Sequence, residues 1–183
     1  MLDVAKNYEL LVRPLGRTAA DEYYHQGNLW IEGRDGNSFV IEACNHTNSP
    51  AVFIISVDGH CIRDGQPAGP NSPGFIVAPK SNYLISSWQL EHGRNEPLIF
   101  ARKSAGIQAG VIGALVYSVG YNNSVAHSLV YNPASMPAPA NTSPTMLAVY
   151  YNSLKNLQKM GILVKTRRNV NYTANAFPLY EQK

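Results

Sequence analysis

The sequence predicts a mainly β protein, an antiparallel β-sandwich of jelly-roll or immunoglobulin-like topology with one short C-terminal helix. Short apolar segments recur along the chain, and Asp-Gly, Gly and Pro turns separate them at regular spacing. A single segment near the C-terminus has the caps and spacing of a helix. Because consecutive strands of such folds need not remain neighbours, the pattern leaves the choice between the two topologies open.

The first strand pair surrounds an Asp-Gly dipeptide. Residues 29–34 and 38–44 flank Asp35-Gly36, and we expect them to form a hairpin with a type I′ turn, in which both central residues have positive φ. In the second arm Phe39 and Ile41 alternate with Glu42, which is typical of a half-buried strand.

The next strand differs in having no alternation. Residues 52–57 read Val-Phe-Ile-Ile-Ser-Val, which predicts a central strand that is covered on both faces. Apolar segments between further turn residues predict additional strands at 75–79, 83–90, 98–102, 111–117, 125–131 and 146–151.

Two segments break the strand pattern. Residues 132–145 contain four prolines, which exclude a regular strand or helix and indicate an ordered arm or a loop. Residues 154–160 have helical spacing, with Asn152 or Ser153 as N-cap and Gly161 as the stop. We expect this helix to cover an edge or an end of the sheets.

The size and composition indicate one globular domain. The chain has 183 residues, of which 45% are hydrophobic. We expect an N-terminal segment at 1–22 and a single sandwich domain at 23–183 that carries the arm. Charged residues make up only 15%, against about a quarter in an average soluble chain. Either the surface is neutral and rich in Asn, Ser and Thr, or neighbouring subunits cover much of it.

Several classes of partner are disfavoured. A net charge of +3 without a long basic stripe argues against nucleic acid. The N-terminus lacks the pattern of a signal peptide, and the apolar run at 107–119 is too short to span a bilayer. We therefore expect synthesis in a cytoplasm and no association with a membrane. Cys44 and Cys61 are favoured as free thiols, although the sequence leaves a disulfide open.

The sequence offers no recognisable catalytic machinery. It contains no G-x-S-x-G elbow, phosphate-binding loop or His-Glu-x-x-His helix. The nearest approach to a reactive cluster is Asp58, His60 and Asp64, a set able to bind a hard metal or transfer protons. Both aspartates precede glycines, however, and Asp-Gly favours turns. We therefore expect no enzyme activity, no metal and no cofactor, with a hydrolase as the least favoured hypothesis.

Four aromatic residues have two interpretations, of which packing is favoured over ligand binding. Tyr23, Tyr24, Trp30 and Trp88 either pack in the core or a subunit contact, or present rings that stack on a sugar.

Three motifs resemble a known family. They are S-V-D-G at 56–59, D-G-Q-P-A at 64–68 and G-F-I-V-A-P at 74–79, with W-I-E-G-R at 30–34 before them and F-P at 177–178 near the end. The pattern resembles uncharacterised β-sandwich domains of bacteria and tailed bacteriophages, over about residues 23 to 180. The sequence departs from it at Phe75, where Tyr is usual, and at Ser87-Trp88, where Gly precedes the aromatic residue.

The resemblance implies a virion-associated or surface accessory domain and carries over no catalytic residue. Together with the low charge, it leads us to expect a phage virion protein, foremost a decoration (cement) protein that binds the major capsid protein outside the head. We expect a homo-oligomer, with a trimer favoured by capsid symmetry, and an interface built from Pro133, Met136, Pro137, Pro139, Tyr23, Tyr24 and Trp88. The alternative is a glycan-binding or ligand-binding module. A position on head or tail stays open.

Overall fold

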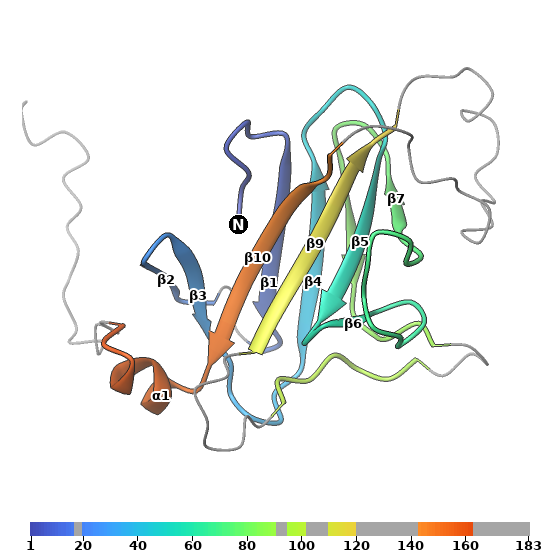
Figure 1. The fold of residues 1–183 in the computed structure, drawn as a ribbon. Coiled ribbons are helices and arrows are strands. Elements are labelled where there is room, and N and C mark those ends of the chain that lie inside the picture. The colour runs from blue at the N-terminus through green and yellow to red at the C-terminus, as the bar shows by residue number, and fades with distance from the viewer. Residues whose placement is uncertain (17–19, 91–94, 102–109, 120–142, 163–183) are drawn as a thin grey trace, which may run out of the picture.

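Two β-sheets face each other across one core, with a short helix at one end (Figure 1). The structure is a computed structural model that describes residues 1–16, 20–90, 95–101, 110–119 and 143–162. This architecture confirms the predicted mainly β sandwich with one short C-terminal helix.

The smaller sheet, called sheet A, has three antiparallel strands in the order β1-β4-β8. They are β1 (Tyr8–Pro14), β4 (Phe39–Asn45) and β8 (Ser81–Ile85). Alternate residues of β1 and β4 are buried, which is the period-two pattern of strands with one face on a core.

The larger sheet, called sheet B, has seven strands. Six follow the order β2-β3-β10-β9-β5-β6, and β7 also pairs with β5. Every described pair of sheet B is antiparallel except β3 with β10, which is parallel. The strands are β2 (Glu22–His25), β3 (Asn28–Glu32), β5 (Ala51–Val57), β6 (His60–Cys61), β7 (Phe75–Val77), β9 (Gly110–Ser118) and β10 (Thr145–Asn152).

The core lies between the two sheets and is rich in aromatic rings. Tyr8 of sheet A meets Phe53 of sheet B edge to face, with ring centroids 5.8 Å apart. Phe39 stacks on Phe100 at 4.4 Å, and Phe100 in turn contacts the ring of Tyr151 at 5.0 Å. These contacts join both sheets and the segment at 95–101 into one hydrophobic cluster.

The expected hairpin around Asp35-Gly36 is wrong. Its two arms lie in different sheets, because β3 pairs with β2 and β10 while β4 pairs with β1 and β8. Only Gly36 of this turn has a positive φ, at 78°. The turn therefore carries the chain from sheet B to sheet A and does not reverse it within one sheet.

The type I′ geometry occurs instead at Asp58-Gly59. Both residues have positive φ, 52° and 84°, and they connect β5 to β6 with Val57 opposite His60. Asp-Gly is thus a hairpin turn where the two flanking strands share a sheet.

The N-terminal residues belong to the sandwich. Strand β1 lies within the segment that we expected to precede the domain, yet its Leu10 is fully buried in the common core. The ammonium group of Met1 donates to the carbonyl of Leu10 at 2.7 Å. The expected boundary between residues 22 and 23 therefore does not separate β1 from the fold.

Most other predicted strands are present. The run at 52–57 forms β5, which is buried on both faces as expected, and the segments at 111–117 and 146–151 form β9 and β10. The segment at 75–79 contains β7, and β8 ends at Ile85, short of the expected residue 90. In the segment at 98–102 the described residues make an isolated bridge from Ile99 to Ser38 in place of a strand. The strand expected at 125–131 lies outside the described residues.

The helix forms where the sequence predicts it. Helix α1 (Leu154–Lys159) begins after Ser153, whose hydroxyl accepts from the amide of Asn156 at 3.4 Å, and ends before Gly161 with φ of 72°. Leu157 is fully buried against Trp30, so the helix covers the end of sheet B next to β3.

Candidate functional site

The outward surface of sheet B carries no charged side chain across β10, β9, β5 and β7. Along the strands of a sandwich, polar residues that face outward usually alternate with apolar residues that face the core. We call this surface the outer B face; its residues are Met146, Ala148, Tyr150, Val111, Gly113, Leu115, Tyr117, Val52, Ile54, Ser56 and Ile76.

The outer B face is accessible in part. Helix α1 packs near Tyr150 at one end, and the chain at Gly74 lies against Val52 and Ile54 at the other margin. Figure 1 looks onto it: β10, β9 and β5 lie in front of β1 and β4, and no described helix or strand crosses them. Val52, Ile54 and Tyr117 are buried in a cluster of their own, while Met146 is 72% exposed. Most of the remaining residues are half-buried.

The register arranges this surface in rows across the strands. Leu115 lies opposite both Met146 and Ile54, which makes one row of large apolar side chains. The next row consists of Ala148, Gly113 and Ser56. A Cβ on Gly113 would lie 3.2 Å from the hydroxyl of Ser56. The small row therefore keeps the middle of the face low and smooth, a shape suited to contact with another surface.

The outward surface of sheet A has the opposite character. Arg13 of β1 and Glu42 of β4 form a salt bridge at 2.6 Å, and the amide of Asn82 on β8 also donates to Glu42. Hydrogen bonding from Asn82 and the charge of Arg13 lower the pKa of Glu42. Such cross-strand ionic pairs are typical of a sheet face in water.

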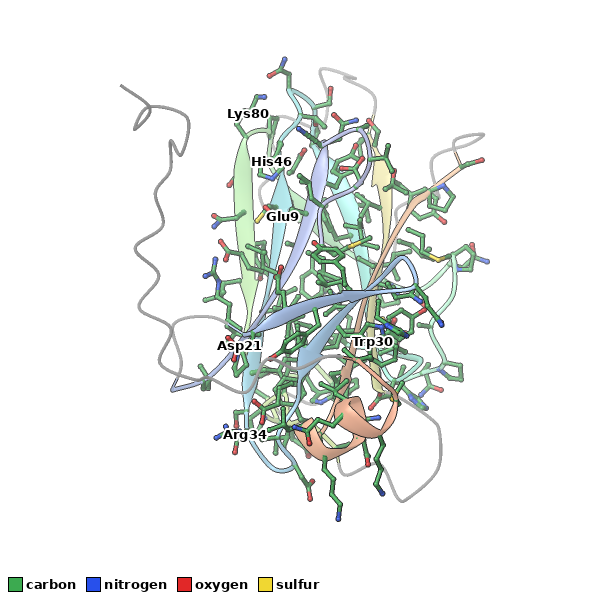
Figure 2. All side chains as sticks on the ribbon, turned by 90° about the vertical axis from the view of Figure 1, so that its left-hand side faces the viewer. Glu9, Asp21, Trp30, Arg34, His46 and Lys80 are labelled. Atoms are coloured by element: carbon green, nitrogen blue, oxygen red, sulfur yellow. The ribbon has the colours of Figure 1, made fainter. Side chains whose placement is uncertain are left out.

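One end of sheet A is also polar. His46 lies 3.3 Å from Glu9, and the ammonium group of Lys80 donates to the carbonyl of His46 at 2.6 Å (Figure 2). Charged side chains therefore lie on the outward surface of sheet A and are absent from the outer B face.

Two of the predicted interface residues lie on β2. Tyr23 is opposite Trp30 of β3, and both pack with Tyr150 and helix α1 in a small second cluster. Trp30 is only 8% exposed, and its indole N–H has no hydrogen-bond partner in the described part of the chain. Tyr24 is 73% exposed. Of these aromatic residues, Tyr24 alone presents an accessible ring.

The other predicted interface residues are not brought together with β2. Trp88 is half-buried against the main core, and its amide donates to the carbonyl of Glu96 at 2.7 Å. The arm residues Pro133, Met136, Pro137 and Pro139 lie outside the described residues.

The residues considered for catalysis have structural partners. The carboxylate of Asp58 accepts from the hydroxyl of Tyr151 at 2.6 Å and from the amide of Val111 at 3.0 Å. Asp64 accepts from the amide of Gln66 at 3.0 Å, as the turn chemistry predicts, and His60 is exposed. Within the described ranges, no three His, Cys, Asp or Glu residues gather as a metal site would require.

The two cysteines are free and buried. Burial raises the pKa of the Cys44 thiol to about 11 and raises that of Cys61 as well. At neutral pH both are therefore protonated and poor nucleophiles.

The three family-like motifs lie close together in the fold. S-V-D-G makes the turn between β5 and β6, and D-G-Q-P-A returns to β6, where the amide of Ala68 donates to the carbonyl of Gly59 at 2.8 Å. The guanidinium of Arg63 donates to the carbonyl of Gly74 at 2.9 Å and lies 5.2 Å from the ring centre of Phe75. The motifs therefore build one corner of sheet B.

Comparison of the chain with protein-family models, with curated proteins and with solved structures gives no match. Among the described residues, no helix has the length and hydropathy needed to cross a membrane. The fold and the surface define the protein as a mainly β sandwich with one uncharged sheet face. The sequence contains the signal for this face, because residues 110–118 read G-V-I-G-A-L-V-Y-S without a charge. That pattern by itself predicts only a strand.

Proposed function

We propose that the chain is a structural protein of a bacteriophage particle, foremost a decoration protein that binds the major capsid protein on the outside of the head. The observation that supports this most is the uncharged outer B face. This face has no charged side chain, whereas Arg13 and Glu42 form an ion pair on the outward surface of sheet A.

The physical reason is the cost of leaving such a surface in water. Burial of apolar surface favours association, and exposed apolar patches rimmed by polar residues mark interaction sites. Leu115 and Met146 supply apolar side chains, and the row of Gly113 allows close approach. On a capsid, a modest contact repeated by symmetry gains affinity through avidity.

The aromatic residues predicted as contacts lie outside the accessible part of this surface. Tyr23 and Trp30 continue the row of Tyr150 on the outward side of sheet B, where helix α1 packs on them. Trp88 packs against the main core. Tyr24 lies opposite Leu29 of the main core, so its ring points to the other side of sheet B from the outer B face.

An antiserum raised against the purified chain tests the proposal. Intact particles of the phage that encodes the chain are labelled with it and examined by electron microscopy with gold conjugates. We expect label on the heads. Label confined to tails would overturn the decoration role and keep a virion role. If the particles carry no label and mass spectrometry detects none of the chain in them, both roles would be overturned. A matched serum against an unrelated β-sandwich controls for non-specific binding.

A further inference from the structure

Strand β8 is an edge strand with unusual composition for that position. Natural edge strands usually carry charges or proline, or are very short, because their free backbone groups otherwise pair with other chains. The described edges β1, β2 and β6 follow this rule: β1 has Arg13 and Pro14, β2 has Glu22, and β6 has two residues. Strand β8 reads Ser-Asn-Tyr-Leu-Ile, without charge or proline.

The free backbone groups of β8 follow from the pairing of its neighbour. The amide of Leu15 donates to the carbonyl of Ser38, so even-numbered residues of β4 face β1 and odd-numbered residues face β8. Tyr83 and Ile85 lie opposite Ala43 and Ile41 and therefore point their backbone groups at β4. The backbone N–H and C=O of Asn82 and Leu84 must then point away from the sheet.

The two ends of this edge are occupied, which limits what remains. On the same side, the backbone carbonyl of Ser86 accepts a hydrogen bond from the amide of Leu98 at 3.4 Å. The backbone amide of Lys80 donates to the carbonyl of Thr47 at 3.1 Å. Between them, the hydroxyl of Ser81 lies 3.5 Å from the carbonyl of Asn82, and no described strand pairs with Asn82 or Leu84 on that side. The open stretch is two outward residues long.

We propose that two copies of the chain pair through β8, antiparallel, about a twofold axis at Tyr83. In this register Asn82 of each copy lies opposite Leu84 of the other, and each such pair exchanges two N–H···O bonds. All the open backbone groups of both copies are then used. A register shifted to place Leu84 opposite its counterpart would instead bring Asn82 against Ser86, which already bonds to Leu98.

The side chains suit a second copy of the same strand. No like charges meet, since Lys80 comes opposite Ser86 of the second copy. Leu84 is 61% exposed and Tyr83 is 41% exposed, so a second copy beside the strand covers part of both side chains. Sheet A then continues across the axis as six strands. This twofold pair replaces the trimer that capsid symmetry suggested, and it is independent of whether the outer B face binds a capsid.

Cysteine cross-linking of the purified full chain tests both the contact and the register. Tyr83 meets its counterpart in a non-hydrogen-bonded pair, where the Cα atoms lie about 4.5 Å apart, within disulfide range. We expect Tyr83→Cys to form a covalent dimer under mild oxidation. Leu84→Cys, which is more exposed but faces Asn82, is the matched control and should form at least about tenfold less dimer. The native thiols do not interfere because both are buried.

Light scattering across a dilution series gives the second readout. We expect twice the chain mass of 20.1 kDa for the unaltered protein. Leu84→Pro removes an outward N–H without touching the β4 pairing, and should raise the dimer dissociation constant at least about tenfold. Leu84→Ala keeps the N–H and should remain dimeric. A monomer or trimer at all concentrations, or equal cross-linking of the two cysteine variants, would overturn the proposal.

Discussion

The hydroxyl of Tyr151 on β10 donates a hydrogen bond to the carboxylate of Asp58 at 2.6 Å, across 93 positions of sequence. Asp58 has a positive φ in the tight turn after β5, and its second carboxylate oxygen accepts from the amide of Val111 on β9 at 3.0 Å. One aspartate thus ties the ends of three strands together, which gives the S-V-D-G motif a structural role.

Loss of the Tyr151 hydroxyl should destabilise the protein. In Tyr151→Phe the ring keeps its packing against Phe100, but the Asp58 carboxylate loses a donor. We expect the free energy of unfolding to fall by about 1.5–3 kcal/mol, the usual range for a hydrogen bond to a charged group. Urea denaturation followed by circular dichroism measures it. Tyr24→Phe, at an exposed ring, is the control and should leave the midpoint unchanged; an equal effect of the two changes would refute the role of the bond.

The same pair predicts a dependence of stability on alkaline pH. Burial, and then the hydrogen bond and charge of Asp58, raise the pKa of Tyr151 above its ordinary value of 10.0. The folded protein therefore keeps the phenol protonated where the unfolded chain ionises, so this contribution is full below pH 10 and is lost as pH rises further. We expect the stability of the unaltered protein to fall more steeply above pH 10 than that of Tyr151→Phe. Parallel curves for the two proteins would contradict the assignment.

A glycine beside this ring should not tolerate a side chain. A Cβ on Gly110 would lie 2.0 Å from Cζ of Tyr151. Overpacking of this kind costs about 1–3 kcal/mol, so Gly110→Ala should lower the unfolding midpoint in urea. In a Tyr151→Leu background the ring is absent, and the same change should cost much less; additive effects of the two substitutions would show that the contact is not the cause.

Local patterns predicted the strands better than their partners. The period-two alternation around Ile41 and the cap at Ser153 are local signals, and both elements formed. The pairing of β4 with β1 depends on contacts such as Arg13 with Glu42, 29 positions apart, and no local signal specifies it. For this reason Asp35-Gly36 looked like a hairpin turn although its arms lie in different sheets.

The candidate surface was missed for a related reason. A run such as β9 shows that both of its faces are apolar, but the sequence does not say which neighbours continue the pattern. The outer B face emerges only when the register sets Met146, Leu115 and Ile54 in one row. Tyr23 and Trp30 attracted attention as aromatic residues, yet they pack against each other and α1.

The native thiols should be almost unreactive in the folded protein. A pKa of about 11 for Cys44, against an ordinary 9.0, reduces its thiolate fraction near neutral pH about a hundredfold, and burial hinders access further. Titration with a chromogenic disulfide reagent at pH 8 should therefore be slow until denaturant is added. Met146→Cys, at an exposed position, supplies a fast third thiol as the control. Rapid reaction of both native cysteines without denaturant would contradict their buried environment.

Binding of the purified chain to phage particles that lack it tests the central claim most directly. Co-sedimentation compares the unaltered protein with Met146→Glu on the outer B face and Leu84→Lys on the outward surface of sheet A, two exposed positions that tolerate a charge in the free protein. We predict that Met146→Glu weakens binding at least about tenfold, because it forces an unpaired charge into an apolar contact. Each Leu84→Lys subunit should retain its contact with the particle. Unchanged binding by Met146→Glu, or its loss in Leu84→Lys alone, would contradict the assignment of the outer B face.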